Sequence, residues 1–224
     1  MRSPIQTRYE DLPEELPIFP LSGALLLPWG RLPLNIFEPR YLNMTLDALG
    51  AGRIIGMIQP DYDRDSKAAA PPAEPSVYSI GCAGRIASFE ETEDGRLLIM
   101  LKGLCRFSIV SELEGRKGYR RVKASYDAFK PDLEVLANFE VNRERLFERL
   151  RPYLEAHAMP LSVDVLKGLS DSSLVTSLCM ICPFDPREKQ ALLEAPTLKA
   201  RYDIVLALLQ IAAFEAGGID TPRQ

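Results

Sequence analysis

The chain has a single histidine, His157, and this limits the catalytic chemistry that the sequence can support. A Ser-His-Asp triad, a Cys-His pair and a multi-histidine metal site would all have to share this side chain. It follows the end of a predicted helix, where the helix dipole alone favours an imidazole. No Gly-Lys dipeptide occurs, which excludes a phosphate loop of the G-x-x-x-x-G-K type. We expect no catalytic residue, no metal and no cofactor, and therefore a protein that is not an enzyme.

The segment Cys179-Met180-Ile181-Cys182 has the C-x-x-C spacing of a redox motif. Such a motif has its first cysteine exposed at the start of a helix that follows a strand. Here the pair comes at the end of a predicted helix, directly before Pro183, and no second C-x-x-C completes a zinc site. All four cysteines, Cys82, Cys105, Cys179 and Cys182, lie in apolar segments. We expect them to be small buried hydrophobic residues.

Two charged clusters could support binding or acid–base chemistry. The acidic cluster consists of Glu90, Glu91, Glu93 and Asp94, and the basic cluster of Arg116, Lys117, Arg120, Arg121 and Lys123. The acidic residues flank a predicted turn, where solvated carboxylates are usual. Basic residues on an edge strand often act against aggregation, and Glu112 and Glu114 stand beside this cluster. Neither cluster predicts a particular activity.

The only tryptophan lies in the turn Leu27-Pro28-Trp29-Gly30. Because the turn contains proline and glycine, the Trp29 side chain is not expected to be fully buried. An indole in such a turn usually covers the local core. It can also anchor a ligand, because it offers a large apolar area and one hydrogen-bond donor.

The composition is that of a globular protein, with 46% hydrophobic and 26% charged residues. The polar residues 1–15 contain no secretory signal. The most apolar run, Ile204–Phe214, is interrupted by Gln210 and is shorter than the roughly 20 residues of a membrane span. We expect a cytoplasmic protein without a membrane partner.

The first half of the chain is predicted to be β-rich. Short apolar runs between turn signals predict strands at Leu16–Leu21, Ala24–Leu27, Arg31–Phe37, Ile54–Ile58, Val77–Phe89, Arg96–Val110 and Tyr119–Phe129. Asp94-Gly95 predicts a hairpin. Glu38-Pro39 opens one helix, which ends at Gly50 and whose predicted inner stripe is Tyr41, Leu42, Thr45, Leu46 and Leu49. Asp61–Ser76 is expected to be an exposed flexible loop.

At Pro131-Asp132 the hydrophobic period becomes helical. Asp132 is the predicted N-cap of a long helix that extends to Tyr153, and Ser170, Asp185 and Thr197 are predicted to cap three more. The fold class is therefore α+β. We expect an N-terminal tail at 1–15, a β-rich subdomain at 16–130, a helical subdomain at 131–218 and a C-terminal tail at 219–224.

Several ordered blocks resemble the N-terminal, LON substrate-binding domain of Lon proteases. They are Leu16–Leu21, Pro33–Tyr41, Ile55–Pro60, Ile80–Ile86, Gly103–Phe107 and Pro183–Asp185. The resemblance extends from about Leu12 to Ala216. Nothing in the sequence matches the Walker motifs of the Lon ATPase or the Ser-Lys protease domain. The expected form is therefore a stand-alone domain without those two parts.

The resemblance implies a PUA-like β-barrel followed by an α-helical bundle. In Lon proteases this region helps to capture unfolded or degron-bearing polypeptides. It thus implies a non-catalytic polypeptide-binding module, an adaptor or regulator of protein degradation, whose partners are such polypeptides and a separate Lon protease. The candidate groove residues, expected on one rim, are Trp29, Phe37 and Tyr41; the structural family motif at the strand-to-helix corner is Glu38, Pro39 and Arg40.

Two other functions remain as alternatives to polypeptide binding. PUA-like barrels in other families bind RNA, although a net charge of −4 and a pI near 5.3 count against a nucleic-acid partner. A barrel could also hold a small molecule. The sequence gives no indication of oligomeric state.

Overall fold

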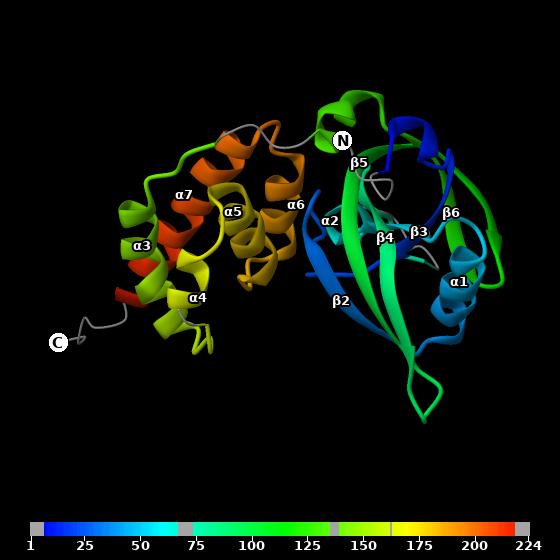
Figure 1. Ribbon diagram of the computed structural model, residues 1–224, viewed down its shortest axis with the longest axis horizontal. Coiled ribbons are helices and arrows are strands. Elements are labelled where there is room, and N and C mark those ends of the chain that lie inside the picture. Colours follow the sequence, from blue (N-terminus) through cyan, green and yellow to red (C-terminus); the bar gives the residue numbers. More distant parts are fainter. Residues whose placement is uncertain (1–6, 67–73, 135–138, 162, 218–224) are drawn as a thin grey trace. The chain divides into compact units, whose positions relative to one another are not determined.

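A computed structural model describes residues 7–66, 74–134, 139–161 and 163–217, with side chains described as far as residue 212 (Figure 1). The chain divides into two compact units, Met1–Val135 and Leu136–Gln224. The first contains the strands and the second contains helices only, among the described residues. This is the α+β composition that the sequence predicts.

The β unit is built on one mixed sheet. Its strands are β1 (Glu15–Pro20), β2 (Arg31–Ile36), β3 (Ile54–Ile58), β4 (Ile80–Glu91), β5 (Leu97–Arg116) and β6 (Tyr119–Ser125). The spatial order is β2-β5-β4-β3-β1-β6, and the long strand β5 also pairs with β6, so that the ladder closes on itself. β1 and β3 run parallel, whereas the other ladders are antiparallel. In the described part of the sheet, β2 pairs with β5 alone.

The predicted hairpin at Glu93-Asp94-Gly95 is present between β4 and β5. Gly95 has φ of 77°, in the left-handed region, and its N–H donates to the carbonyl oxygen of Thr92. The Thr92 N–H donates to the carbonyl oxygen of Arg96, which closes a three-residue loop. Asp94 keeps a negative φ, so the turn relies on the glycine alone.

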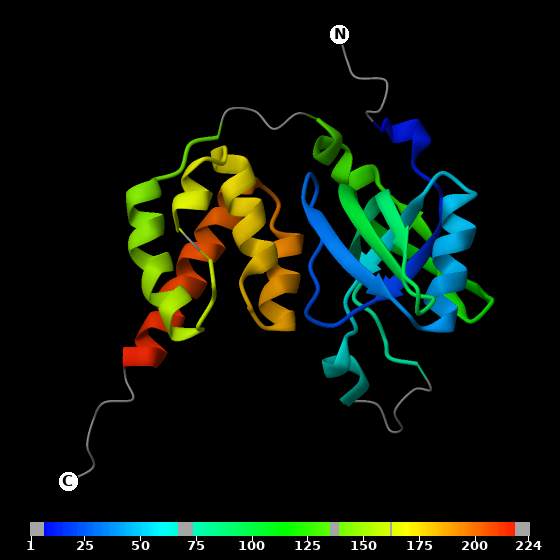
Figure 2. The ribbon, with the colours of Figure 1, turned by 60° about the horizontal axis from the view of Figure 1, so that its bottom comes forward.

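Helix α1 (Pro39–Leu49) packs across the sheet against β1, β3 and β6 (Figure 2). Pro39 occupies the first turn, as predicted. The buried face is Tyr41, Met44, Thr45 and Ala48, so the predicted inner stripe is wrong in part. Leu46 is exposed, because the positions three, four and seven residues after Tyr41 define the face that meets the sheet.

Two further expectations for the β unit need correction. Ala24–Leu27 forms no strand, although Leu25–Leu27 is buried, because a short apolar run does not by itself distinguish a strand from an irregular core segment. Asp61–Ser76 is not irregular throughout, since Tyr62–Ser66 forms the short helix α2. The backbone N–H of Ser76 donates to the Asp65 carboxylate, and residues 67–73 lie outside the described residues.

The predicted long helix from Asp132 is wrong. The strand β6 ends at Ser125, and a 3-10 segment, η2 (Asp127–Leu133), follows it. Helix α3 (Arg143–Ala156) begins later, where the Asn142 side chain accepts a hydrogen bond from the Arg145 N–H as its N-cap. The side chain of Asp132 is instead engaged by an arginine of β5, a tertiary contact that no local pattern shows.

The helical unit continues with α4 (Val163–Lys167), α5 (Asp171–Ile181), α6 (Pro186–Glu194) and α7 (Leu198–Gly217), of which the short α4 was not predicted. The three predicted caps are present. Ser170 accepts from the Ser173 N–H, Thr197 accepts from the Ala200 N–H, and Asp185 forms a reciprocal capping box with Glu188. α3, α5 and α6 each contact α7. None of the helices in the described ranges is long and apolar enough to cross a membrane.

Candidate functional site

Strands β2, β5 and β4 present one face to the core and the opposite face to the surface. Residues directly opposite each other in antiparallel strands point to the same face. Ile99 and Leu101 of β5 are buried, so Leu98 and Met100, which alternate with them along the strand, belong to the surface face. Two rows cross the three strands on that face, and their members are Pro33, Met100 and Ser88 in one row and Asn35, Leu98 and Glu90 in the other.

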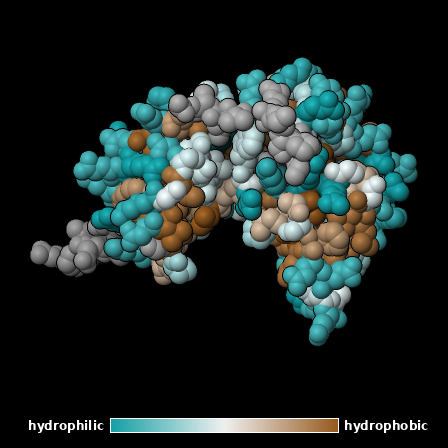
Figure 3. Space-filling view, viewed as in Figure 1, coloured by the Kyte–Doolittle hydropathy of each residue, from teal (hydrophilic) through white to brown (hydrophobic). Residues whose placement is uncertain are grey.

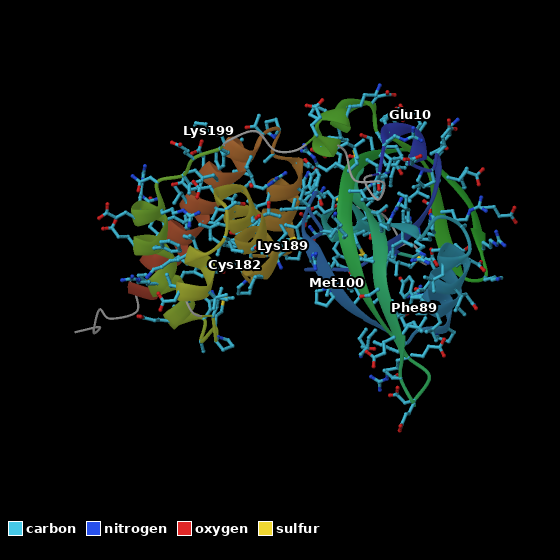
Figure 4. All side chains as sticks on the ribbon, in the orientation of Figure 1. Glu10, Phe89, Met100, Cys182, Lys189 and Lys199 are labelled. Carbon is cyan, nitrogen blue, oxygen red and sulfur yellow. The ribbon has the colours of Figure 1, made fainter. Side chains whose placement is uncertain are left out.

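A groove of about 450 Å³ lies on this part of the sheet, and we call it the apolar groove. It is lined by Pro33, Leu34, Asn35, Ser88, Phe89, Glu90, Leu98, Ile99 and Met100. Met100 and Phe89 are marked on β5 and β4 in Figure 4. Hydrophobic residues gather over the long strands in Figure 3, whereas the hairpin tip below them is hydrophilic. The groove therefore combines apolar walls with a polar rim of Ser88, Asn35 and Glu90, which suits contact with an apolar segment.

Phe37 lies at the hairpin end of β2. Its side chain is 61% exposed, and the Arg96 guanidinium lies 5.8 Å from the centroid of its ring. Arg96 directly precedes β5, so this contact joins the two strands just beyond the last ladder pair, Ile36 with Leu97. Phe37 is therefore an exposed aromatic residue, but it does not line the apolar groove.

Trp29 lies at the other end of β2. Its side chain is 37% exposed, and its Nε1 donates to the Asp132 carbonyl oxygen at 2.9 Å. Its backbone φ is 67°, a left-handed value that costs a non-glycine residue roughly 1–2 kcal/mol. The Lys102 Nζ lies 5.6 Å from the centroid of the indole. The ring is thus held in a fixed place and is not a freely mobile anchor.

The predicted single rim of Trp29, Phe37 and Tyr41 is not found. The six residues of β2 separate Trp29 from Phe37 by about 20 Å at ~3.3 Å per residue. Tyr41 is only 6% exposed and stacks on Phe19, with 4.1 Å between ring centroids. Proximity in sequence misled the prediction, because an extended strand carries neighbouring residues far apart and a helix turns Tyr41 inward.

The corner residues Glu38, Pro39 and Arg40 have structural contacts. The Arg40 guanidinium donates twice to the Glu38 carboxylate, at 3.0 and 2.8 Å, and lies 4.7 Å from the Tyr41 ring centroid. The Glu38 side chain makes no capping hydrogen bond to α1. Burial acts to lower the pKa of Arg40, but the hydrogen bond to Glu38 and the neighbouring charges together outweigh burial and raise this pKa. The corner is held by an ion pair between neighbours and by Pro39.

A second hollow, of about 500 Å³, opens beside Trp29, and we call it the Trp29 cavity. Its lining residues are Thr7, Trp29, Leu49, Gly52, Arg53, Arg85, Ile86, Ala87, Lys102, Gly103, Leu104 and Leu133. The register of β4 with β5 is irregular here, so that Ala87 and Leu104 are the extra residues of two bulges. Bulges redirect side chains and are frequent beside functional sites.

The basic cluster at 116–123 is largely paired with carboxylates. Arg116 and Lys117 both contact Asp47, Arg120 contacts Glu112, and Arg121 contacts Glu15. The hydrogen bond from Lys117 lowers the pKa of Asp47. A cation that is already paired offers little to a phosphate backbone. The geometry therefore gives no support to RNA binding at this cluster.

The cysteines, His157 and the acidic cluster were considered for chemistry in the sequence, and each has surroundings typical of a structural role. Burial raises the pKa of the Cys105, Cys179 and Cys182 thiols to about 12, the opposite of what a reactive cysteine needs. His157 follows α3 and stacks on Tyr153, with 4.1 Å between ring centroids. In the acidic cluster, the hydrogen bond from Thr92 lowers the pKa of Asp94, which also pairs with Arg96. Among the described residues no group of histidine, cysteine and carboxylate side chains could hold a metal ion.

With the closed mixed sheet, the helices and the apolar groove described, comparison with known proteins gives the family of this chain. The family model of the ATP-dependent protease La (LON) substrate-binding domain matches residues 15–210. The chain belongs to this family. It is 29% identical to Lon protease 2 of Myxococcus xanthus, with 89% of this chain and 24% of that protein covered. It is also 29% identical to the Lon protease of Anaeromyxobacter dehalogenans, with 93% of this chain and 24% of that protein covered. The chain thus spans about a quarter of the length of these relatives.

Two solved structures share the fold. A crystal structure of a Lon N-terminal domain protein from Xanthomonas campestris has a TM-score of 0.58 and 23% identity, covering 86% of this chain and 97% of that chain. The N-terminal domain of the Mycobacterium avium complex Lon protease has a TM-score of 0.54 and 15% identity, covering 92% of this chain and 100% of that chain. The fold is that of a Lon N-terminal domain, with a mixed sheet and helices. Its assignment as a PUA-like barrel with a helical bundle stays a prediction.

Sequence reasoning missed the apolar groove. Its residues come from three strands, and Leu98 and Met100 were read only as parts of the predicted strand Arg96–Val110. The unbroken apolar run Leu97–Leu101 was a usable signal, because an antiparallel strand with one solvated face would carry polar residues at positions 98 and 100.

Proposed function

We propose that this protein binds exposed apolar segments of unfolded or degron-bearing polypeptides in the apolar groove, as a non-catalytic recognition module. Membership of the LON substrate-binding domain family supports polypeptide recognition. The single observation that carries the location is the side chain of Leu98, which lines the apolar groove and is 42% exposed on the surface face of the sheet. Such a side chain loses water on contact with another apolar group, and this supplies the driving force.

The wider role that we infer is that of an adaptor or regulator of protein degradation, with Lon protease as a partner. Lon proteases are the relatives that the comparison finds. A module that holds an unfolded segment without cleaving it can present that segment to a protease or withhold it from one. Co-purification of a Lon protease with the tagged chain, or its absence, tests this inference separately from the binding itself.

The groove is tested by the variant Leu98→Asn/Met100→Asn. We expect its affinity for a permanently unfolded protein, such as reduced and S-alkylated α-lactalbumin, to fall about tenfold. That corresponds to roughly 1.4 kcal/mol, a typical loss for two central apolar contacts. The measurement is a binding isotherm together with a thermal melt of each variant.

Val110→Asn is the matched control. Val110 lies on the same strand and is 60% exposed, yet it does not line the groove. It should bind the unfolded protein like the wild type. Equal losses in both variants would indicate general surface stickiness, and no loss in either would place the binding surface elsewhere, so both results contradict the proposed groove.

A further inference from the structure

The surface face of the sheet carries three basic residues in one cross-strand row. Lys102 of β5 stands opposite Arg31 of β2 on one side and Arg85 of β4 on the other. Like charges directly opposite each other in a sheet repel. In the described part of the chain none of the three forms an ion pair with a carboxylate. This arrangement contrasts with the basic cluster at 116–123, where four of five cations have acidic partners.

Two members of this row, Arg85 and Lys102, line the Trp29 cavity together with Arg53. The Nε of Arg85 is buried and has no hydrogen-bond partner. Among the described residues it is the one buried side-chain nitrogen or oxygen without such a partner. A buried donor without a partner is uncommon in a folded protein and calls for an acceptor that the described residues do not supply. The guanidinium is the side chain best suited to a planar, two-oxygen anion.

The other residues that line the Trp29 cavity are mostly apolar. They include Trp29, Leu49, Ile86, Leu104 and Leu133, and Thr7 is the polar exception. Trp29 and Arg53 both have φ in the left-handed region, at 67° and 66°. The backbone is therefore strained at two residues that line the cavity, and such strain is frequent at ligand-binding sites. A free phosphate would satisfy the cations but leave these walls without contact.

We propose that the Trp29 cavity is a binding site for a carboxylate group carried on an apolar, aromatic-sized body. The carboxylate accepts from Arg85 and is attracted by Lys102 and Arg53, while the body packs against Trp29 and the leucine and isoleucine walls. Two sources share this chemistry, a small aromatic acid and the free C-terminus of a polypeptide that ends in an aromatic residue. The volume of about 500 Å³ suits either ligand.

Trp29 is the only tryptophan, so its fluorescence reports on this cavity and on nothing else in the chain. The probes are 3-phenylpropionate and its amide, and a short acetylated peptide ending in phenylalanine as the free acid and as the amide. We expect both acids to change the Trp29 emission in a saturable way, and both amides to bind at least about tenfold more weakly. About 0.5 M salt should weaken the binding of the acids. Tighter binding of the peptide acid than of the small acid identifies a polypeptide end as the source, and the reverse identifies a small molecule.

The variant Arg85→Gln should weaken binding of the acids about tenfold, whereas Arg64→Gln, which removes an exposed arginine of α2 outside the cavity, should not. Because Arg85 has a buried unpaired donor beside two like charges, its replacement should leave the melting temperature unchanged or raised. Equal binding of acid and amide, or of inorganic phosphate and acid, would overturn the proposal, as would a large loss of stability in Arg85→Gln. Leu98 and Met100 do not line this cavity, so failure here leaves the test of the apolar groove independent.

Discussion

Replacement of Asp132 by alanine is expected to destabilise the β unit by about 3–5 kcal/mol, the loss typical of one partner removed from a buried ion pair. The Asp132 carboxylate accepts from the Arg106 side chain at 2.8 Å through both Nε and Nη2, and from the Arg106 backbone N–H at 3.0 Å. The two side chains are only 8% and 11% exposed. Burial alone would lower the pKa of Arg106, but the hydrogen bond to Asp132 and the attraction of its charge together more than offset burial, and the pKa is raised. Without Asp132, a buried guanidinium keeps its charge and loses the carboxylate acceptor that Asp132 supplies.

Chemical denaturation followed by circular dichroism measures this loss. Asp127→Ala is the control, because Asp127 pairs with Lys130 within the same η2 segment but at the surface, and its removal should hardly move the unfolding midpoint. The double variant Arg106→Met/Asp132→Leu should recover much of the stability lost in the single variant, since it removes both charges together. Similar destabilisation by Asp132→Ala and Asp127→Ala would contradict the central role of the buried pair.

The second large effect is expected for Gly103→Ala, which should lower the free energy of unfolding by about 3 kcal/mol. A Cβ atom at Gly103 would lie 2.0 Å from the Leu27 carbonyl oxygen and 2.8 Å from the Leu27 carbonyl carbon. Both are backbone atoms, so the turn before β2 would have to move away from β5. That movement strains the hydrogen bonds of Gly103 with Trp29 and Gly30, at 3.0 and 2.9 Å.

Tryptophan emission should change together with stability in Gly103→Ala, because Trp29 belongs to the displaced turn. Gly50→Ala provides the comparison: its Cβ would meet nothing nearer than the Asp47 carbonyl oxygen at 3.6 Å, and its φ is ordinary for alanine. We expect Gly50→Ala to melt close to the wild type. A Gly103→Ala protein with unchanged melting and emission would show that the close approach of the turn to β5 is not needed.

Features specified within a few residues could be predicted from the sequence. The capping box of Asp185 and Glu188, the proline in the first turn of α1 and the glycine of the hairpin were found, because each depends on local hydrogen bonds or local backbone freedom. The helix start assigned to Asp132 failed for the opposite reason. Its carboxylate is committed to Arg106, which is distant in sequence, and a capping pattern does not show a competing tertiary partner.

Both candidate sites depend on register, which a single sequence does not give. Arg31, Lys102 and Arg85 become neighbours only when β2 and β4 pair with β5 in one particular alignment, and the bulges at Leu104 and Ala87 shift that alignment twice. Trp29 was singled out from sequence as a turn-borne aromatic, and it does line a cavity. Its surroundings of cations and leucines come from distant segments and could not have been predicted.

The most direct test of polypeptide recognition is a heteronuclear NMR titration of the isotope-labelled chain with the permanently unfolded protein. Saturable shifts of the backbone amides at Ser88, Leu98 and Met100 are predicted, with no such shifts on addition of the same protein in its native form. This pattern would place an apolar, unfolded segment in the groove across β2, β5 and β4. An unperturbed spectrum at high concentrations of the unfolded protein, or shifts confined to residues outside this groove, would contradict the account.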